Sequence, residues 1–164
     1  VTPERGLTAY FHDTGYQTLF GVDHYALDIR ANHSSPIYAP ADGIVFSVVF
    51  DKTSTRYAYI MIAHRKGVMT LYGHISAPNV AVGDFVKRGD VLGLSGATPH
   101  TVGAGFRTTG PHLHFEVWQD GARVDPLKYL PLDEAPMDSL PEQYLNQLKN
   151  TLEEQIKNIQ IQLD

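Results

Sequence analysis

The chain has 164 residues, of which 43% are hydrophobic and 19% charged, a composition typical of one folded domain and unlike that of disordered segments. The net charge of −5 argues against a general nucleic-acid binder, and the absence of cysteine excludes a disulfide scaffold, a thiol nucleophile and a cysteine-ligated zinc site. No apolar run approaches the roughly 18 residues of a membrane-spanning helix, and no basic stretch leads into an apolar one after Val1, so we expect neither a transmembrane segment nor a signal peptide in this chain.

The first 133 residues are predicted to be mainly β. Short runs of β-branched and aromatic residues alternate with Gly, Pro, Asn and Asp, and all 14 glycines lie before residue 122. No helical periodicity of useful length interrupts them. We therefore expect a small antiparallel β-sheet domain of hairpins and meanders. The predicted strands are 43–50, 57–63, 68–74, 91–95 and 112–118.

The tail from residue 134 differs in charge and pattern. It holds six acidic and two basic side chains, against 12 and 11 in residues 1–133. Six apolar residues recur at steps of three and four, which predicts one stripe on an amphipathic helix: Leu145, Leu148, Leu152, Ile156, Ile159 and Leu163. Ser139 is the expected N-cap. Residues 134–164 thus read as a linker and a helix, which either packs on its own domain or forms a coiled coil that self-associates through 140–163.

Two histidines separated by a single residue lie in the last predicted strand. Alternation along a strand places His112, His114 and Glu116 on one face, while Leu113 and Phe115 point to the other. Two imidazoles on one face could share a metal ion, or one could bind it while the other moves a proton. By itself such a pair is more often a surface coincidence than a site.

Further candidate ligands lie upstream. His24 and Asp28 can converge on one ion, and His74 ends a predicted strand. His24, Asp28 and one histidine of the later pair would give three protein ligands and leave the fourth tetrahedral position open, which is the arrangement of catalytic zinc. The two remaining histidines could then act as general base and as stabiliser of an oxyanion.

Together these segments resemble the lysostaphin/LytM-type zinc endopeptidases. The likeness runs from about residue 17 to 132 and rests on H-x3-D at 24–28, YGH at 72–74 and TTGPHLHFE at 108–116. Segments 36–45, 82–93 and 124–130 match in the same order. The resemblance implies a split-barrel-like antiparallel fold with a groove over one zinc ion, held by His24, Asp28 and His114. It also implies that His74 and His112 are the unligated pair beside the metal.

The function implied by this resemblance is zinc-dependent hydrolysis of peptide bonds in bacterial peptidoglycan cross-links or stem peptides. The substrate would place the domain, residues 1–133, outside the cell or in its envelope. One alternative is a non-catalytic regulator of other cell-wall hydrolases, but all five site positions are present. Another is a lipoyl-type carrier, suggested by the hairpin at 83–90, but that turn has no lysine at its tip.

The chain departs from the family pattern at three places. Ala26 stands where glycine is usual, so a positive φ there would be strained. Arg56-Tyr57-Ala58 replaces a common Tyr-Gly-Asn. The segment 97–107 is longer than usual, and we expect it to be mobile, to line the cleft and to influence peptide specificity.

The other polar and aromatic residues near these motifs receive simpler interpretations. His64 is expected either to support the site or to be structural. Three histidines, His12, His33 and His100, are expected to be solvated. Trp118 is expected to pack in the core or on the strand face. Glu116 is not expected to be a ligand, because it lies one strand step beyond His114.

Overall fold

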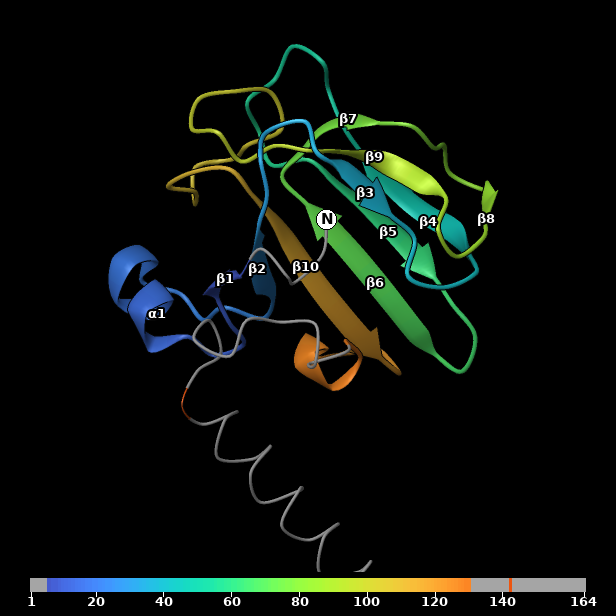
Figure 1. Cartoon of the computed structure of the whole chain (residues 1–164), viewed down its shortest axis with the longest axis horizontal. Helices are drawn as coiled ribbons and strands as arrows, with labels where there is room; N and C mark the ends of the chain where they lie inside the picture. Colours follow the sequence, from blue (N-terminus) through green and yellow to red (C-terminus); the bar gives the residue numbers. More distant parts are fainter. Residues whose placement is uncertain (1–5, 131–141, 143–164) are drawn as a thin grey trace, which may run out of the picture.

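The computed structural model describes residues 6–130 and Glu142, and within this part of the chain the protein is built from antiparallel strands in two sheets (Figure 1). The large sheet has eight strands. In chain order they are β1 (Leu7–Ala9), β2 (Leu27–Arg30), β4 (Gly43–Val49), β5 (Tyr59–Ala63), β6 (Val68–Gly73), β8 (Phe85–Val86), β10 (His112–Gln119) and β11 (Ala122–Val124). The spatial order is β1-β2-β10-β6-β5-β4-β8, with β11 paired to β10.

The small sheet has three strands in the order β3-β9-β7. They are β3 (Pro36–Tyr38), β7 (Ile75–Pro78) and β9 (Val91–Ser95). A 3-10 turn, η2 (Pro126–Lys128), follows the last strand. Each of the five predicted strands is present with ends that differ by no more than two residues, so the prediction of a mainly β, antiparallel domain is confirmed.

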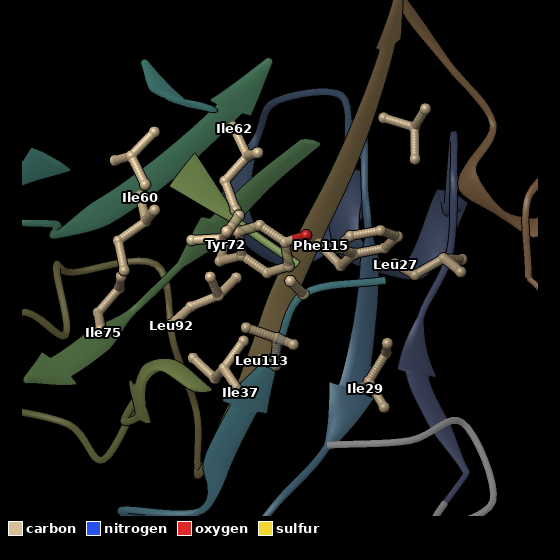
Figure 2. Close-up of a cluster of buried hydrophobic side chains, with 14 of the residues drawn as sticks. Leu27, Ile29, Ile37, Ile60, Ile62, Tyr72, Ile75, Leu92, Leu113 and Phe115 are labelled. Carbon is tan, nitrogen blue, oxygen red and sulfur yellow. The ribbon is translucent and has the colours of Figure 1, made fainter. Parts of the chain in front are cut away.

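The core lies between the two sheets. Ile37, Ile75 and Leu92 of the small sheet join Ile60 and Ile62, Tyr72, and Leu113 and Phe115 of the large sheet in one buried cluster (Figure 2). Along β10 the apolar residues enter this core because alternate side chains of a strand point to opposite faces. The other face of β10, which carries His114 and Glu116, therefore stays available for chemistry.

A short helix, α1 (Thr14–Phe20), was not predicted. Asp13 caps its first turn by accepting a hydrogen bond from the Tyr16 backbone N–H (2.8 Å), and Gly21 ends it in the left-handed conformation (φ 70°). The helix buries no residue, so it has no apolar stripe that periodicity could reveal. Its packing places Tyr16 beside His24.

The predicted linker and amphipathic helix of 134–164 lie outside the described residues, apart from Glu142. The boundary near residue 133 and self-association through 140–163 stay predictions. Within the described residues, no helix combines the length and apolar character that crossing a bilayer requires.

Candidate metal centre and active site

Three predicted ligands meet where β2 and β10 pair. Asp28 on β2 lies directly opposite His114 on β10, and His24 reaches them from the segment just before β2. Asp28 Oδ1 lies 3.2 Å from His24 Nε2 and 2.9 Å from His114 Nδ1, and the two nitrogens are 3.4 Å apart. A tetrahedral zinc ion with bonds of about 2.0–2.1 Å separates its ligand atoms by about 3.3 Å. The spacing of these three donors therefore fits one zinc ion.

The far side of each imidazole is fixed by an acceptor. His24 Nδ1 donates to the Tyr10 carbonyl at 2.9 Å, and His114 Nε2 donates to Glu116 Oε1 at 3.2 Å. When the two rings are neutral, as metal ligands are, these bonds select the tautomers that leave His24 Nε2 and His114 Nδ1 with lone pairs toward the shared point. Both rings are thus oriented as metal ligands are.

Glu116 lies outside the ligand trio, as expected, but it has a supporting position that sequence reasoning missed. Besides accepting from His114, its carboxylate accepts from Trp118 Nε1 at 2.8 Å and from Arg123 Nε at 2.9 Å. Burial alone would raise the pKa of Glu116, but the bonds from His114 and Arg123 outweigh it and lower the pKa. Glu116 therefore stays ionised behind His114. Trp118 packs on the strand face, half-buried.

Hydrogen bonds within the trio favour the ionised form of Asp28 and the protonated form of His114. Burial would raise the pKa of Asp28, but hydrogen bonds from His114 and His24 hold the pKa of this carboxyl well below its usual range. Burial would lower the pKa of His114, yet its bonds to Asp28 and Glu116 raise that pKa to about 9. The buried Asp28 carboxylate thus favours a cation beside it, either a proton on His114 or a metal ion.

His74 and His112 stand beside the trio without belonging to it. Their ring centroids are 4.7 Å apart, and each ring donates from Nδ1 to a carbonyl, His74 to Ala104 (2.6 Å) and His112 to Gly110 (2.7 Å). In both rings Nε2 is therefore the lone-pair nitrogen. Burial, with help from His112 and His114, lowers the pKa of His74 to about 3 and keeps it neutral.

His112 Nε2 is the buried side-chain polar atom that has no hydrogen-bond partner within residues 6–130 and 142, and it lies 3.6 Å from Asp28 Oδ2. A buried nitrogen without a partner indicates a place for a ligand oxygen or a water. All five predicted site residues are thus brought together, on either side of one point.

Two tyrosines to which the sequence analysis gave no role complete the walls, Tyr16 and Tyr57. The Tyr16 ring stacks on His24 with centroids 4.2 Å apart, and the Tyr57 ring meets His74 edge-on at 4.9 Å. Tyr57 fits because residue 73 is glycine: a Cβ there would lie 2.7 Å from Tyr57 Cζ. The cavity that these rings share with the metal centre has a volume of about 680 Å³.

The segment 97–107 lines this cavity through Gly105, Phe106 and Arg107, as predicted. Gly103 and Ala104 are buried, and Gly103 and Gly105 donate backbone hydrogen bonds to the carbonyls of 54 and 55. The segment is therefore tied down over 103–105, and the expected mobility stays a prediction for its exposed part.

The remaining expectations resolve simply. Ala26 is fully buried and does not have a positive φ, so its backbone does not carry the strain that a positive φ would cause. His64 is structural: it bonds the Asp42 carbonyl (2.9 Å) and Thr70 Oγ1 (2.8 Å). The other three histidines, His12, His33 and His100, are exposed as predicted.

Comparison with known proteins places this geometry in context. The model of peptidase family M23 matches residues 22–126. The chain is 38% identical over 105 residues to the DD-carboxypeptidase/endopeptidase Mpg of Neisseria meningitidis, covering 63% of this chain and 22% of that protein. It is 36% identical over 126 residues to the peptidoglycan DD-endopeptidase ShyB of Vibrio cholerae, covering 76% of this chain and 28% of that protein. The match thus spans less than a third of either relative.

Solved structures give the same picture. A zinc-containing peptidase from Vibrio cholerae superposes with a TM-score of 0.62 at 34% identity, covering 77% of this chain and 37% of that one. The catalytic domain of lysostaphin from Staphylococcus simulans superposes with a TM-score of 0.56 at 27% identity, covering 76% of this chain and 87% of that one.

Proposed function

Because the chain belongs to peptidase family M23, we propose that its described domain is a zinc-dependent endopeptidase that hydrolyses peptide bonds in peptidoglycan cross-links or stem peptides. The observation that carries this proposal is the spacing of His24 Nε2, Asp28 Oδ1 and His114 Nδ1, 2.9–3.4 Å apart, beside two histidines that are not part of the trio. The relatives named as DD-endopeptidases support the substrate class.

His24, Asp28 and His114 would hold the zinc ion and leave a coordination position open. Zinc, when bound, lowers the pKa of a coordinated water to about 7 and polarises a carbonyl oxygen. The protein's own contribution is orientation. Tyr10 and Glu116 fix the two imidazoles, and the burial of Asp28 excludes competing solvent.

His74 and His112 would handle the proton. Each has a lone pair on Nε2, so one ring takes the proton of the attacking water and later returns it to the leaving amine. The other ring would take up a separate proton from solvent on Nε2 and donate it as a hydrogen bond to the oxyanion of the tetrahedral intermediate.

The test is zinc content together with clearing of purified peptidoglycan by wild type and two variants. We expect His114→Ala to lose both zinc and clearing, because one of three ligands is gone. His112→Ala should keep zinc and lose turnover. A matched control is His33→Ala, since His33 is exposed and bonds only Thr98 Oγ1 (2.9 Å) among the described residues.

Two outcomes would contradict the proposal. One is a wild-type protein that contains no bound zinc after incubation with zinc and removal of the excess by dialysis. The other is His114→Ala that clears as fast as wild type. If His112→Ala loses zinc as well as turnover, the roles of the two histidines on β10 are exchanged.

A peptidoglycan substrate places the working site at the cell envelope or outside the cell, and we propose this location for the domain. No specific observation favours the alternative of a non-catalytic regulator, since all five site side chains are present and adjacent.

A further inference from the structure

Two arginines on the wall of the metal-site cavity make no direct contact with an acidic side chain among the described residues, although Arg56 is near enough to Asp51 to help lower the pKa of that carboxyl. Arg56 and Arg107 are both exposed and both line the cavity that contains His24 and His114. Within residues 6–130 and 142, neither guanidinium makes a hydrogen bond or an ion pair. A cavity lined by two guanidinium groups without an anionic hydrogen-bond partner is expected to attract an anionic ligand.

These arginines are held on one wall by the backbone. Gly103 donates to the Ser54 carbonyl (3.0 Å) and accepts from the Ala58 N–H (3.0 Å), while Gly105 donates to the Thr55 carbonyl (2.8 Å). The segments that carry Arg56 and Arg107 are therefore tied side by side.

Glycine is needed for this close approach. Gly105 has a φ of +66°, and a Cβ there would lie 3.1 Å from Tyr57 Cβ. The backbone positions of residues 56 and 107 are thus set by the fold.

The other charges that line the cavity are already occupied. Arg123 donates to Glu116 at 2.9 Å, and Asp23 accepts from Gln17 Nε2 (3.0 Å) and Tyr25 Oη (3.1 Å). Asp23 keeps its negative charge, since both of its donors are neutral, but the three arginines of the cavity exceed its two acidic side chains, Asp23 and Glu116, by one positive charge.

Arg107 also acts close to the metal centre. Burial raises the pKa of Tyr16 to about 12, Asp28 adds to the rise, and the charge of Arg107 opposes it. Arg107 also lines a second cavity with Asp28 and His112, so residue 107 lies beside the metal centre.

Resting on the proposed function, we propose that Arg56 and Arg107 bind a free carboxylate of the substrate close to the scissile bond. The site then selects anionic stem peptides over uncharged ones such as oligoglycine. A planar guanidinium pairs with a carboxylate through two parallel N–H···O bonds, which gives both affinity and orientation.

The test compares kcat/KM for one synthetic cross-linked stem peptide in three forms: with all carboxylates free, with the α-carboxylate next to the scissile amide converted to a carboxamide, and with the neighbouring side-chain carboxylate converted instead. Pentaglycine is a fourth substrate. The proteins are zinc-loaded wild type, Arg56→Gln, Arg107→Gln, the double variant, and Arg65→Gln. Arg65 is an exposed arginine outside this cavity and serves as the matched control.

We expect wild type to prefer the free peptide by about tenfold to a hundredfold over one carboxamide, whose position identifies the carboxylate that is bound. The double variant should lose that preference and cleave the free peptide and that carboxamide with similar kcat/KM. Arg65→Gln should behave as wild type.

The inference is overturned if wild type cleaves all three stem-peptide forms equally, if pentaglycine is the better substrate, or if the double variant keeps the preference. Failure of the proposed function gives a different result, because wild type would then cleave none of the four substrates.

Discussion

Replacing Glu116 by glutamine should weaken zinc binding although Glu116 does not touch the metal. The carboxylate accepts from His114 Nε2 (3.2 Å) on one oxygen and from Trp118 Nε1 (2.8 Å) and Arg123 Nε (2.9 Å) on the other. Both sides of the group therefore face donors. An amide of the same size has one oxygen only, so its NH2 must oppose either His114 or the other pair.

The size of the effect follows from that mismatch. If the amide oxygen stays with Trp118 and Arg123, the two donors there, the His114 ring loses its acceptor and the negative charge that makes Nδ1 a better ligand. Loss of such an outer partner typically lowers metal affinity by tenfold to a hundredfold, which is about 1.4–2.8 kcal/mol of binding free energy.

The assay is competition for zinc between the protein and a chromophoric chelator. Thermal unfolding of the zinc-free variant shows whether the fold itself is intact. Asp120→Asn is the matched control, because Asp120 is an exposed carboxylate that bonds Gln119 Nε2 (2.8 Å). Equal zinc affinity of Glu116→Gln and wild type, in a folded variant, would refute the reasoning.

Three further predictions concern packing, pH and metal removal. Gly73→Ala should lower the free energy of unfolding, measured by urea titration, by about 1–3 kcal/mol, because the new Cβ overlaps Tyr57. Gly110→Ala should change it little, since no atom outside the adjoining residues lies within 4 Å of a Cβ there. Equal effects of the two substitutions would contradict this packing. The folded-state pKa of His74 is lowered from 6.5 to about 3, so the stability that neutral His74 contributes is complete above pH 6.5 and is lost as the pH falls from 6.5 toward 3. Between about pH 7 and about pH 4, the zinc-free wild type should therefore lose more free energy of unfolding than zinc-free His74→Gln. Equal losses in the two proteins would refute the lowered pKa. Chelation of zinc should lower the melting temperature of the protein, and readdition of zinc should restore it. Zinc should stabilise the folded state by about 2.7 kcal/mol when free zinc exceeds the Kd a hundredfold. A melting temperature that changes with neither treatment would contradict a metal ion that stabilises the fold.

The strands could be predicted because they depend on local patterns, and the five candidate site residues, which the family resemblance supplied, lie together in the structure while their roles stay a prediction. Alternation on β10 sends Leu113 and Phe115 into the core and leaves His114 on the other face, and the spacing of His24 and Asp28 is short. These features need no knowledge of which strands become neighbours.

Features that depend on strand order could not be predicted in this way. Tyr57 reaches His74 only because Gly73 leaves room between neighbouring strands. Tyr16 arrives on α1, a helix of seven residues with no buried side chain and hence no apolar period, although Asp13 and Gly21 are the usual residues at its two ends. The bond from Glu116 to Arg123 requires the turn between β10 and β11.

The pairing of β2 with β10 has a consequence for the order of events during biosynthesis. Asp28 and His114 are 86 residues apart in the chain, and His24 and His114 are 90 apart. A newly made chain holds only the weak local pair of His24 and Asp28 until those distant strands have met. We therefore expect zinc to load last, onto a completed sheet, and not to guide the chain toward it. Zinc binding would then report that β2 and β10 have paired, and a chain in which these strands are still apart would not hold the ion.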